Sequence, residues 1–318
     1  MFKRFFLACL TALAVAACAG GQVIQPRAPI FDDYRPTTQA AQLDELRNAI
    51  EKYRDFSVAE REGWKAFGDD EPLMGRHYYS EDAPDYISGD ALDFSRPNNL
   101  MYTDIDGRQV LTGVAFVVRL AEGEPVPEGF AGHMDRWHVH NFVAAIEAAT
   151  EERPFLGWLA KWWLDRNYRN KGDDRGRLAM VHAWVTMDNP DGIFADYNRT
   201  IPYKKLGLPE AYWQGASEEA ARGLNLATEG GCDAINGTLW IATVDKQQER
   251  AINKACGEAA DLVRAAISRE EKTRINKTGE RAWADFDAVW QRVLTPAQKA
   301  RVAAMSEHGS DGHGDDHH

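Results

Sequence analysis

The sequence predicts an α+β protein, with a small antiparallel β-sheet flanked by helices and a helical C-terminal region. Two β-rich runs, at 98–103 and 109–120, flank an Asp-Gly pair at 106–107, which is a strong hairpin signal. From 217 to 305, apolar residues instead recur at helical spacing. Strands are therefore expected in the middle of the chain and helices at its end.

Further elements are expected on both sides of this hairpin. The apolar residues of 38–53 share one helical face, and a capping-box pattern at 57–60 starts a second, short helix. Two more strands are expected at 136–141 and 178–187, which gives a four-stranded sheet. Near the end of the chain, a Thr-Pro-Ala-Gln capping box at 295–298 opens a last helix.

The segment between the last two strands, 142–177, is rich in tryptophan. It begins as a helix, breaks at Pro154 and resumes as a helix that carries Trp158, Trp162 and Trp163. Such a helix can lie in a membrane interface. Burial against the sheet is the favoured interpretation, because the apolar surface is broad and no face is rich in Lys and Arg.

The N-terminus has the order of a bacterial export signal. Two cations precede an apolar stretch within 1–17, and this stretch is too short to span a bilayer. Its end, Val15-Ala16-Ala17-Cys18, resembles the bacterial lipobox, in which the cysteine thiol accepts a diacylglyceryl group. Cleavage before Cys18 and lipidation of its thiol are therefore predicted. The alternative is an ordinary Ala-x-Ala signal that a cysteine follows by chance.

A lipid on Cys18 predicts a location in the cell envelope, with the membrane as a partner. Ala19 follows the cysteine and, by resemblance to sorting signals of bacteria with two membranes, favours the outer membrane, facing the periplasm. Residues 18–36 contain Pro and Gly without periodicity, which is typical of an extended tether. The sequence does not name a protein partner.

Acidic residues exceed basic ones along the chain. The formal net charge is −12, and removal of Lys3 and Arg4 with the signal peptide makes it −14. A protein that binds nucleic acid would show a basic patch, and the sequence shows none. Nucleic acid is therefore not expected as a partner.

The chain has four cysteines, and two of them are expected to form a disulfide. Cys9 leaves with the signal peptide and Cys18 takes the lipid, so Cys232 and Cys256 remain in an oxidising compartment. Their bond would close a loop of about 25 residues and stabilise the fold by around 3 kcal/mol. Metal ligation by these two thiolates is the alternative, but no Cys-x-x-Cys spacing supports it.

Four histidines form a candidate metal site. His138 and His140 are two apart in an expected strand, so both side chains point to the same face. His182 lies in another expected strand, and His77 comes just before the sheet. If the four converge, their imidazoles suit zinc or copper. The alternative is that His77 and His182 are core residues and that the His-x-His pair is partly exposed.

Five short motifs stand between 74 and 198. They are Met74-Gly75-Arg76-His77-Tyr78, Pro97-Asn98-Asn99-Leu100-Met101-Tyr102, Leu111-Thr112-Gly113-Val114, His182-Ala183-Trp184 and Asn189-Pro190-Asp191-Gly192-Ile193-Phe194-Ala195. This pattern resembles a family of exported bacterial proteins without an established activity, over about 40% of the chain. The resemblance implies no enzyme, but it places His77 and His182 in recognisable motifs. The insertion at 142–177 and the C-terminal helices depart from the pattern.

The chain is thus expected to have five segments. They are a signal peptide (1–17), a tether (18–36), an α+β domain with the histidine site (37–205), a helical region (206–306) and a disordered tail (307–318). The tail holds four histidines and three aspartates, which can chelate metal loosely or merely solubilise the chain.

Three functions are compatible with the sequence. The first is a lipoprotein that binds zinc or copper through the four histidines. The second is a metal-dependent enzyme with the same ligands, in which Tyr78 is an acid–base candidate. The third is a structural lipoprotein whose histidines belong to the core. Asp188 and Asp191, in the turn after the His182 strand, are expected to be solvated or to orient an imidazole.

Overall fold

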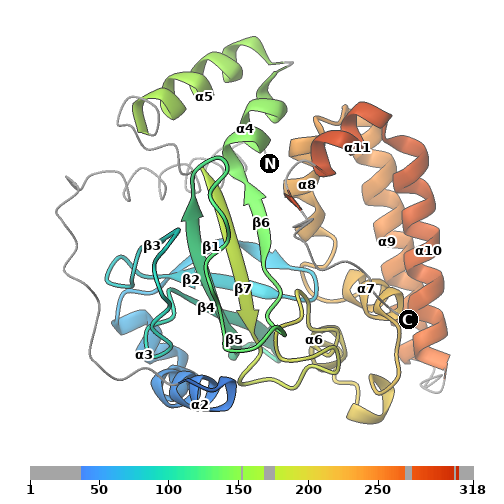
Figure 1. Ribbon diagram of the computed structural model, residues 1–318. Helices are drawn as coiled ribbons and strands as arrows, with labels where there is room; N and C mark the ends of the chain where they lie inside the picture. Colours follow the sequence, from blue (N-terminus) through green and yellow to red (C-terminus); the bar gives the residue numbers. More distant parts are fainter. Residues whose placement is uncertain (1–36, 152, 168–175, 269–273, 304–305, 308–318) are drawn as a thin grey trace, which may run out of the picture.

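The computed structural model describes residues 37–151, 153–167, 176–268, 274–303 and 306–307. An antiparallel sheet occupies the middle of the molecule, and the C-terminal helices pack beside it (Figure 1). The predicted α+β class is therefore confirmed. The signal peptide, Cys18, the tether and the tail from 308 onward lie outside the described residues.

The sheet has eight strands, four more than predicted. They are β1 (Lys65–Glu71), β2 (Gly75–Tyr79), β3 (Tyr86–Ile87), β4 (Asn99–Ile105), β5 (Arg108–Leu120), β6 (His138–Asn141), β7 (Arg177–Ala183) and β8 (Ser306–Glu307). Their order is β1-β2-β4-β5-β7-β6-β8, with antiparallel pairing throughout, and β3 adds a short parallel pairing to β5. The four predicted strands correspond to β4–β7. His77 lies within β2, and so inside the sheet.

The β4–β5 turn has the geometry that its sequence predicts. Asp106 and Gly107 have φ values of 53° and 74°, both in the left-handed region. Two successive positive φ angles define a type I′ turn, whose twist matches that of the two strands of a hairpin. The Asp104 carboxylate accepts a hydrogen bond of 2.8 Å from the Gly107 amide and so holds the turn closed.

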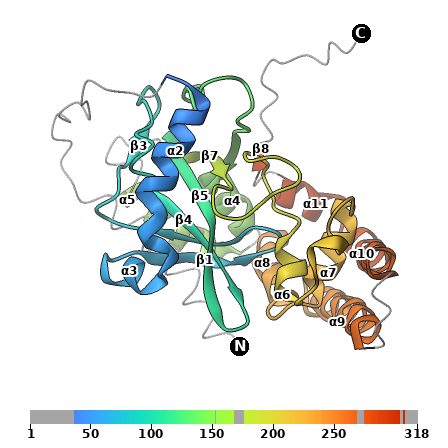
Figure 2. The same cartoon turned by 90° about the horizontal axis from the view of Figure 1, so that it is seen from below.

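Helix α2 (Gln39–Ile50) covers one face of the sheet. The Thr38 side chain caps its first turn, and Leu46 and Ile50 are fully buried in the core that this helix shares with the sheet. Figure 2 shows α2 in front of β4 and β5. The short helix α3 (Phe56–Arg61) follows, and its cap is Asp55, two residues before the expected Ser57.

Side chains of the central strands alternate between two faces. Those facing α2 form the larger apolar core and include Leu100, Val114, Phe116 and Val181. Those facing away include Met101, Ala115, Met180 and His182, and the chain after β7 covers them with Trp184, Met187 and Ile201. The alternation is what period-2 geometry requires. The second face, hereafter the methionine face, carries the predicted histidines.

Helices α4 (Phe142–Thr150) and α5 (Pro154–Asn167) extend beyond the end of the sheet (Figure 1). The predicted break coincides with the start of α5 at Pro154. Phe155, Trp158 and Trp162 are 73%, 63% and 49% exposed, so the expected burial against the sheet was wrong. Helix α5 packs on α4 and lies at a distance from the strands, so its tryptophan side chains do not reach the sheet. No helix in the described part of the chain has the length and apolarity needed to cross a membrane.

The C-terminal region is helical, as predicted. It comprises α6 (Ile201–Lys205), α7 (Glu218–Leu226), α8 (Asn236–Ala242), α9 (Lys246–Ser268), α10 (Ile275–Val293) and α11 (Pro296–Ala303). The capping box that opens α11 is reciprocal. The Gln298 backbone N–H donates to the Thr295 hydroxyl, and the Thr295 backbone N–H donates to the side-chain oxygen of Gln298. These helices have their own core, to which Leu73, from the turn between β1 and β2, also belongs.

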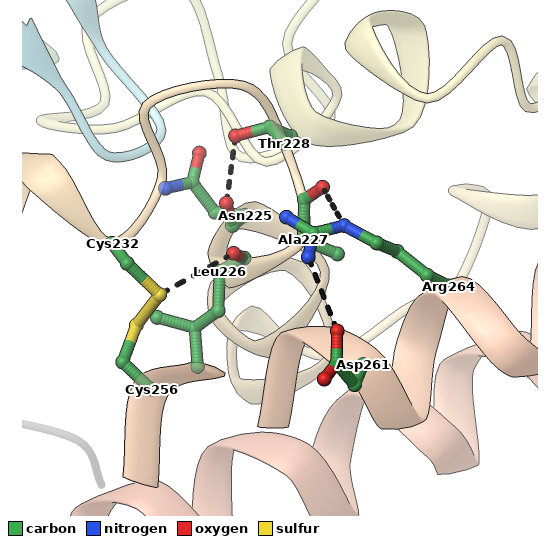
Figure 3. The surroundings of a disulfide bond; sticks show 8 residues. All are labelled: Asn225, Leu226, Ala227, Thr228, Cys232, Cys256, Asp261 and Arg264. Atoms are coloured by element: carbon green, nitrogen blue, oxygen red, sulfur yellow. Dashed lines mark hydrogen bonds and ion pairs between the residues drawn. A yellow bond between two sulfur atoms is a disulfide. The ribbon is translucent and has the colours of Figure 1, made fainter. Parts of the chain in front are cut away.

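The predicted disulfide is present. Cys232 and Cys256 are bonded, with 5.9 Å between their Cα atoms, and the bond fastens the segment after α7 to the middle of α9 (Figure 3). Beside it, Arg264 of α9 donates a 3.3 Å hydrogen bond to the Ala227 carbonyl and lies 3.3 Å from Asp261. Because both thiols are consumed, these cysteines are not available as thiolate metal ligands.

Candidate functional site

The four predicted histidines lie together on the methionine face. His77 comes from β2, His138 and His140 from β6, and His182 from β7. Ring centroids are 5.5 Å apart for His77 and His182, 4.9 Å for His182 and His138, and 5.0 Å for His138 and His140. Each ring therefore contacts the next, and the four form a histidine row rather than a ring around one point.

Small residues on β5 allow the row to form. Strands β2 and β7 are separated by β4 and β5, so His77 and His182 must reach over them to meet. Where the row crosses β5, the strand carries the small residues Gly113 and Ala115, and Ala115 pairs directly with His182. A Cβ atom at Gly113 would lie 2.5 Å from the Ala183 carbonyl oxygen. Nothing larger than glycine therefore fits there.

Three members of the row are buried and retain unused ring nitrogens. His77, His138 and His182 are 6%, 9% and 0% exposed. Nε2 of His77, Nδ1 of His138 and Nε2 of His182 make no hydrogen bond to any described residue. Buried polar atoms in proteins are nearly always paired, so three such atoms in adjacent side chains need an explanation. Half-buried His140 stands at the outer end of the row.

Asp196 orients the centre of the row. Its backbone carbonyl accepts a 2.8 Å hydrogen bond from Nδ1 of His182, which assigns the proton to that nitrogen and leaves the lone pair on Nε2. Its carboxylate oxygen Oδ1 lies 3.6 Å from Nδ1 of His138, too far for a hydrogen bond. Hydrogen bonding of the distal imidazole nitrogen is the usual support of a metal-binding histidine. The sequence did not single out Asp196, although it directly follows the Asn189–Ala195 motif.

The aspartates named from the sequence have other contacts. The Asp191 carboxylate pairs with Arg199 at 3.1 Å. Asp188 accepts hydrogen bonds at its backbone carbonyl, from Asn198 at 3.1 Å and from the Thr200 hydroxyl at 3.2 Å. Both therefore stabilise the turn that follows β7, and the orienting contact to the imidazole comes from the Asp196 backbone instead.

Tyr78 lies on the wrong face for chemistry at the histidines. As the neighbour of His77 in β2, it points to the opposite side of the sheet. There it packs edge-to-face against Phe56 and Tyr102 in the core under α2. Its expected role as an acid–base group beside these histidines was therefore wrong.

Burial keeps the inner histidines neutral. Loss of solvation lowers the pKa of His77 to about 4, and the nearby His138 and His140 add to this effect. Loss of solvation also lowers the pKa of His182 well below its usual value, against the opposing hydrogen bond to Asp196. Near neutral pH both rings are uncharged and each keeps one lone pair, which is the form that ligates metals.

The four imidazoles of the row are not arranged around a common point. Among the described residues, no three His, Cys, Asp or Glu side chains are placed around one point so that they could hold a metal. Neighbouring pairs within the row are close, whereas the row as a whole is extended. Metal binding by His77, His138, His140 and His182 thus stays a prediction.

No protein-family model, curated protein or solved structure matches this chain. The resemblance to a family of exported bacterial proteins stays a prediction as well.

Proposed function

We propose that this protein is an exported lipoprotein that binds a transition metal, zinc or copper, through the histidine row. One observation carries this proposal: three adjacent buried imidazoles have ring nitrogens without hydrogen bonds. A buried polar atom without a partner costs about 1–3 kcal/mol, and coordination would remove that cost. Imidazole is a ligand common to zinc and copper.

His182 is the centre of the proposed site. It lies between His77 and His138, and the Asp196 carbonyl already fixes the ring so that Nε2 can act as the ligand atom. Because no three ligand side chains in the described part of the chain surround one point, binding requires rotation of at least one imidazole. His77 and His138 are the members that can turn, since a nitrogen of each ring makes no hydrogen bond, whereas the Asp196 carbonyl holds His182.

Elemental analysis tests the proposal. The test protein is the full chain, extracted in detergent, with His308→Ser, His313→Ser, His317→Ser and His318→Ser to remove chelation by the tail; we call it the tail-substituted protein. After incubation with Zn²⁺ or Cu⁺ and gel filtration, we expect about one ion per chain. His138→Ala is expected to lower the affinity at least about tenfold.

His133→Ala is the matched control, because His133 is exposed and outside the row. It should retain the metal. A tail-substituted protein that gains neither zinc nor copper would contradict the proposal and favour a structural lipoprotein with core histidines. Equal metal retention in the His138 and His133 variants would place the ion elsewhere. The proposal is limited to binding, and Tyr78, one acid–base candidate from the sequence, lies on the opposite face and gives catalysis no support.

The proposed location is the cell envelope, with the lipid on Cys18 in the outer membrane. The Cys232–Cys256 disulfide supports an oxidising compartment. We expect the protein to incorporate labelled palmitate and to sediment with membranes, and Cys18→Ser to abolish the label. Cys9→Ser is the control, since Cys9 lies inside the signal peptide and should be dispensable. Equal labelling of both variants would contradict lipidation at Cys18.

A further inference from the structure

Methionines gather on the same face of the sheet as the histidines. The chain has seven, and the structure describes five of them. Four of these five share one small buried cluster: Met74, Met101, Met180 and Met187. The fifth, Met134, is 60% exposed. The larger apolar core under α2 is built from other residue types, so methionine is concentrated beside the row.

The strand register places two of these methionines next to the buried histidines. Met101 of β4 is the direct cross-strand partner of His77, and Met180 of β7 is the direct partner of His138. Directly opposed residues in antiparallel strands have Cβ atoms about 5 Å apart on one face. Met180 is also two residues from His182 along β7, and so shares its face. Every buried histidine of the row thus has a thioether neighbour.

This combination of ligands distinguishes between the two metals. Thioether sulfur is a soft donor and selects Cu⁺, whereas zinc prefers histidine, thiolate and carboxylate in a four-coordinate site. The described residues contain no ready group of three His, Cys, Asp or Glu side chains, which a zinc site would need. Histidine pairs with adjacent methionines, in a buried and largely apolar place, suit Cu⁺ instead.

We propose that the ion bound by this protein is copper(I), held by a pair of imidazoles, His182 with one of its neighbours His77 and His138, together with the thioethers of Met101 and Met180. This inference rests on the proposed function, because it names the metal of the same site. The competing explanation is that methionine merely fills irregular space in the core. Leucine fills similar space without a soft donor atom, so a Met→Leu exchange separates the two explanations.

The test compares both metals on the tail-substituted protein. Cu⁺ affinity is measured without oxygen against the chromogenic chelator bathocuproine disulfonate, and Zn²⁺ affinity against a chromogenic zinc chelator. Met101→Leu and Met180→Leu, made singly, are each expected to weaken Cu⁺ binding about tenfold or more. Zn²⁺ binding should be unchanged in both. Two variants on different strands are used so that a folding defect in one does not decide the result.

Met187→Leu is the matched control, since this residue belongs to the same buried cluster but follows β7 and is not a cross-strand partner of a histidine. It should keep the Cu⁺ affinity of the parent. If the parent binds zinc or copper and neither Met101→Leu nor Met180→Leu changes Cu⁺ affinity, the copper(I) assignment is overturned while the proposed function stands. If the parent binds neither ion, both fail together.

Discussion

Gly223→Ala is expected to lower the free energy of unfolding by about 3 kcal/mol, the upper part of the usual range for overpacking a tight contact. Helices α7 and α10 cross at this residue, and a Cβ atom at Gly223 would run into the carbonyl oxygen of Gly279. A Cβ at Gly279 would in turn lie 2.5 Å from the Ala220 carbonyl oxygen. Both obstacles are backbone atoms, so a side-chain rotation cannot relieve them.

Gly257→Ala supplies the control for this prediction. Gly257 lies inside α9, and an added Cβ there meets no heavy atom within 4 Å. Alanine should therefore stabilise that helix by about 0.5–1 kcal/mol. Urea denaturation of both variants measures the contrast. If Gly223→Ala proved as stable as Gly257→Ala, the helices would not approach as closely as described, and the core of the C-terminal region would need a different explanation.

The parts of the fold that the sequence predicted are those encoded locally. Asp106-Gly107 carries the backbone preference of its own turn, and Thr295 and Gln298 satisfy each other within one helical turn. Strands β1 and β8 lacked such signals. β1 reads Lys-Ala-Phe-Gly-Asp-Asp-Glu, a charged sequence typical of a sheet edge, and β8 has two residues that join β6 only through distant pairing.

The site was predicted in its residues but not in its arrangement. Residue type and spacing alone indicated His138, His140 and His182. That the rings form a row depends on the register across five strands, from β2 to β6, and on the close approach of Gly113 to β7, which are properties of the folded sheet. Asp196 acts on His182 through a backbone carbonyl, and any residue type has one. The sequence therefore contained no side-chain signal for this contact.

Acidification is expected to destabilise the protein through His77. The buried ring has a pKa of about 4, whereas in the unfolded chain it returns to its ordinary value of 6.5. Between these values the unfolded state binds a proton that the folded state does not, so stability falls as the pH falls. The contribution of this histidine to the free energy of unfolding is fully present above pH 6.5 and is lost progressively toward pH 4. At pH 5 the loss from His77 alone amounts to about 2 kcal/mol.

A comparison of His77→Gln with the unsubstituted protein isolates this effect. Urea denaturation at pH 7.5 and at pH 5, in the presence of a chelator to exclude metal, gives the loss of stability for each. On acidification, the free energy of unfolding of the variant should fall by about 2 kcal/mol less than that of the unsubstituted protein, because glutamine does not titrate. His133→Gln replaces an exposed ring outside the row and should behave as the parent does. Identical losses in the parent and in His77→Gln would mean that the His77 ring binds its proton in the folded protein. The neutral imidazole needed for metal ligation would then be missing at one end of the row.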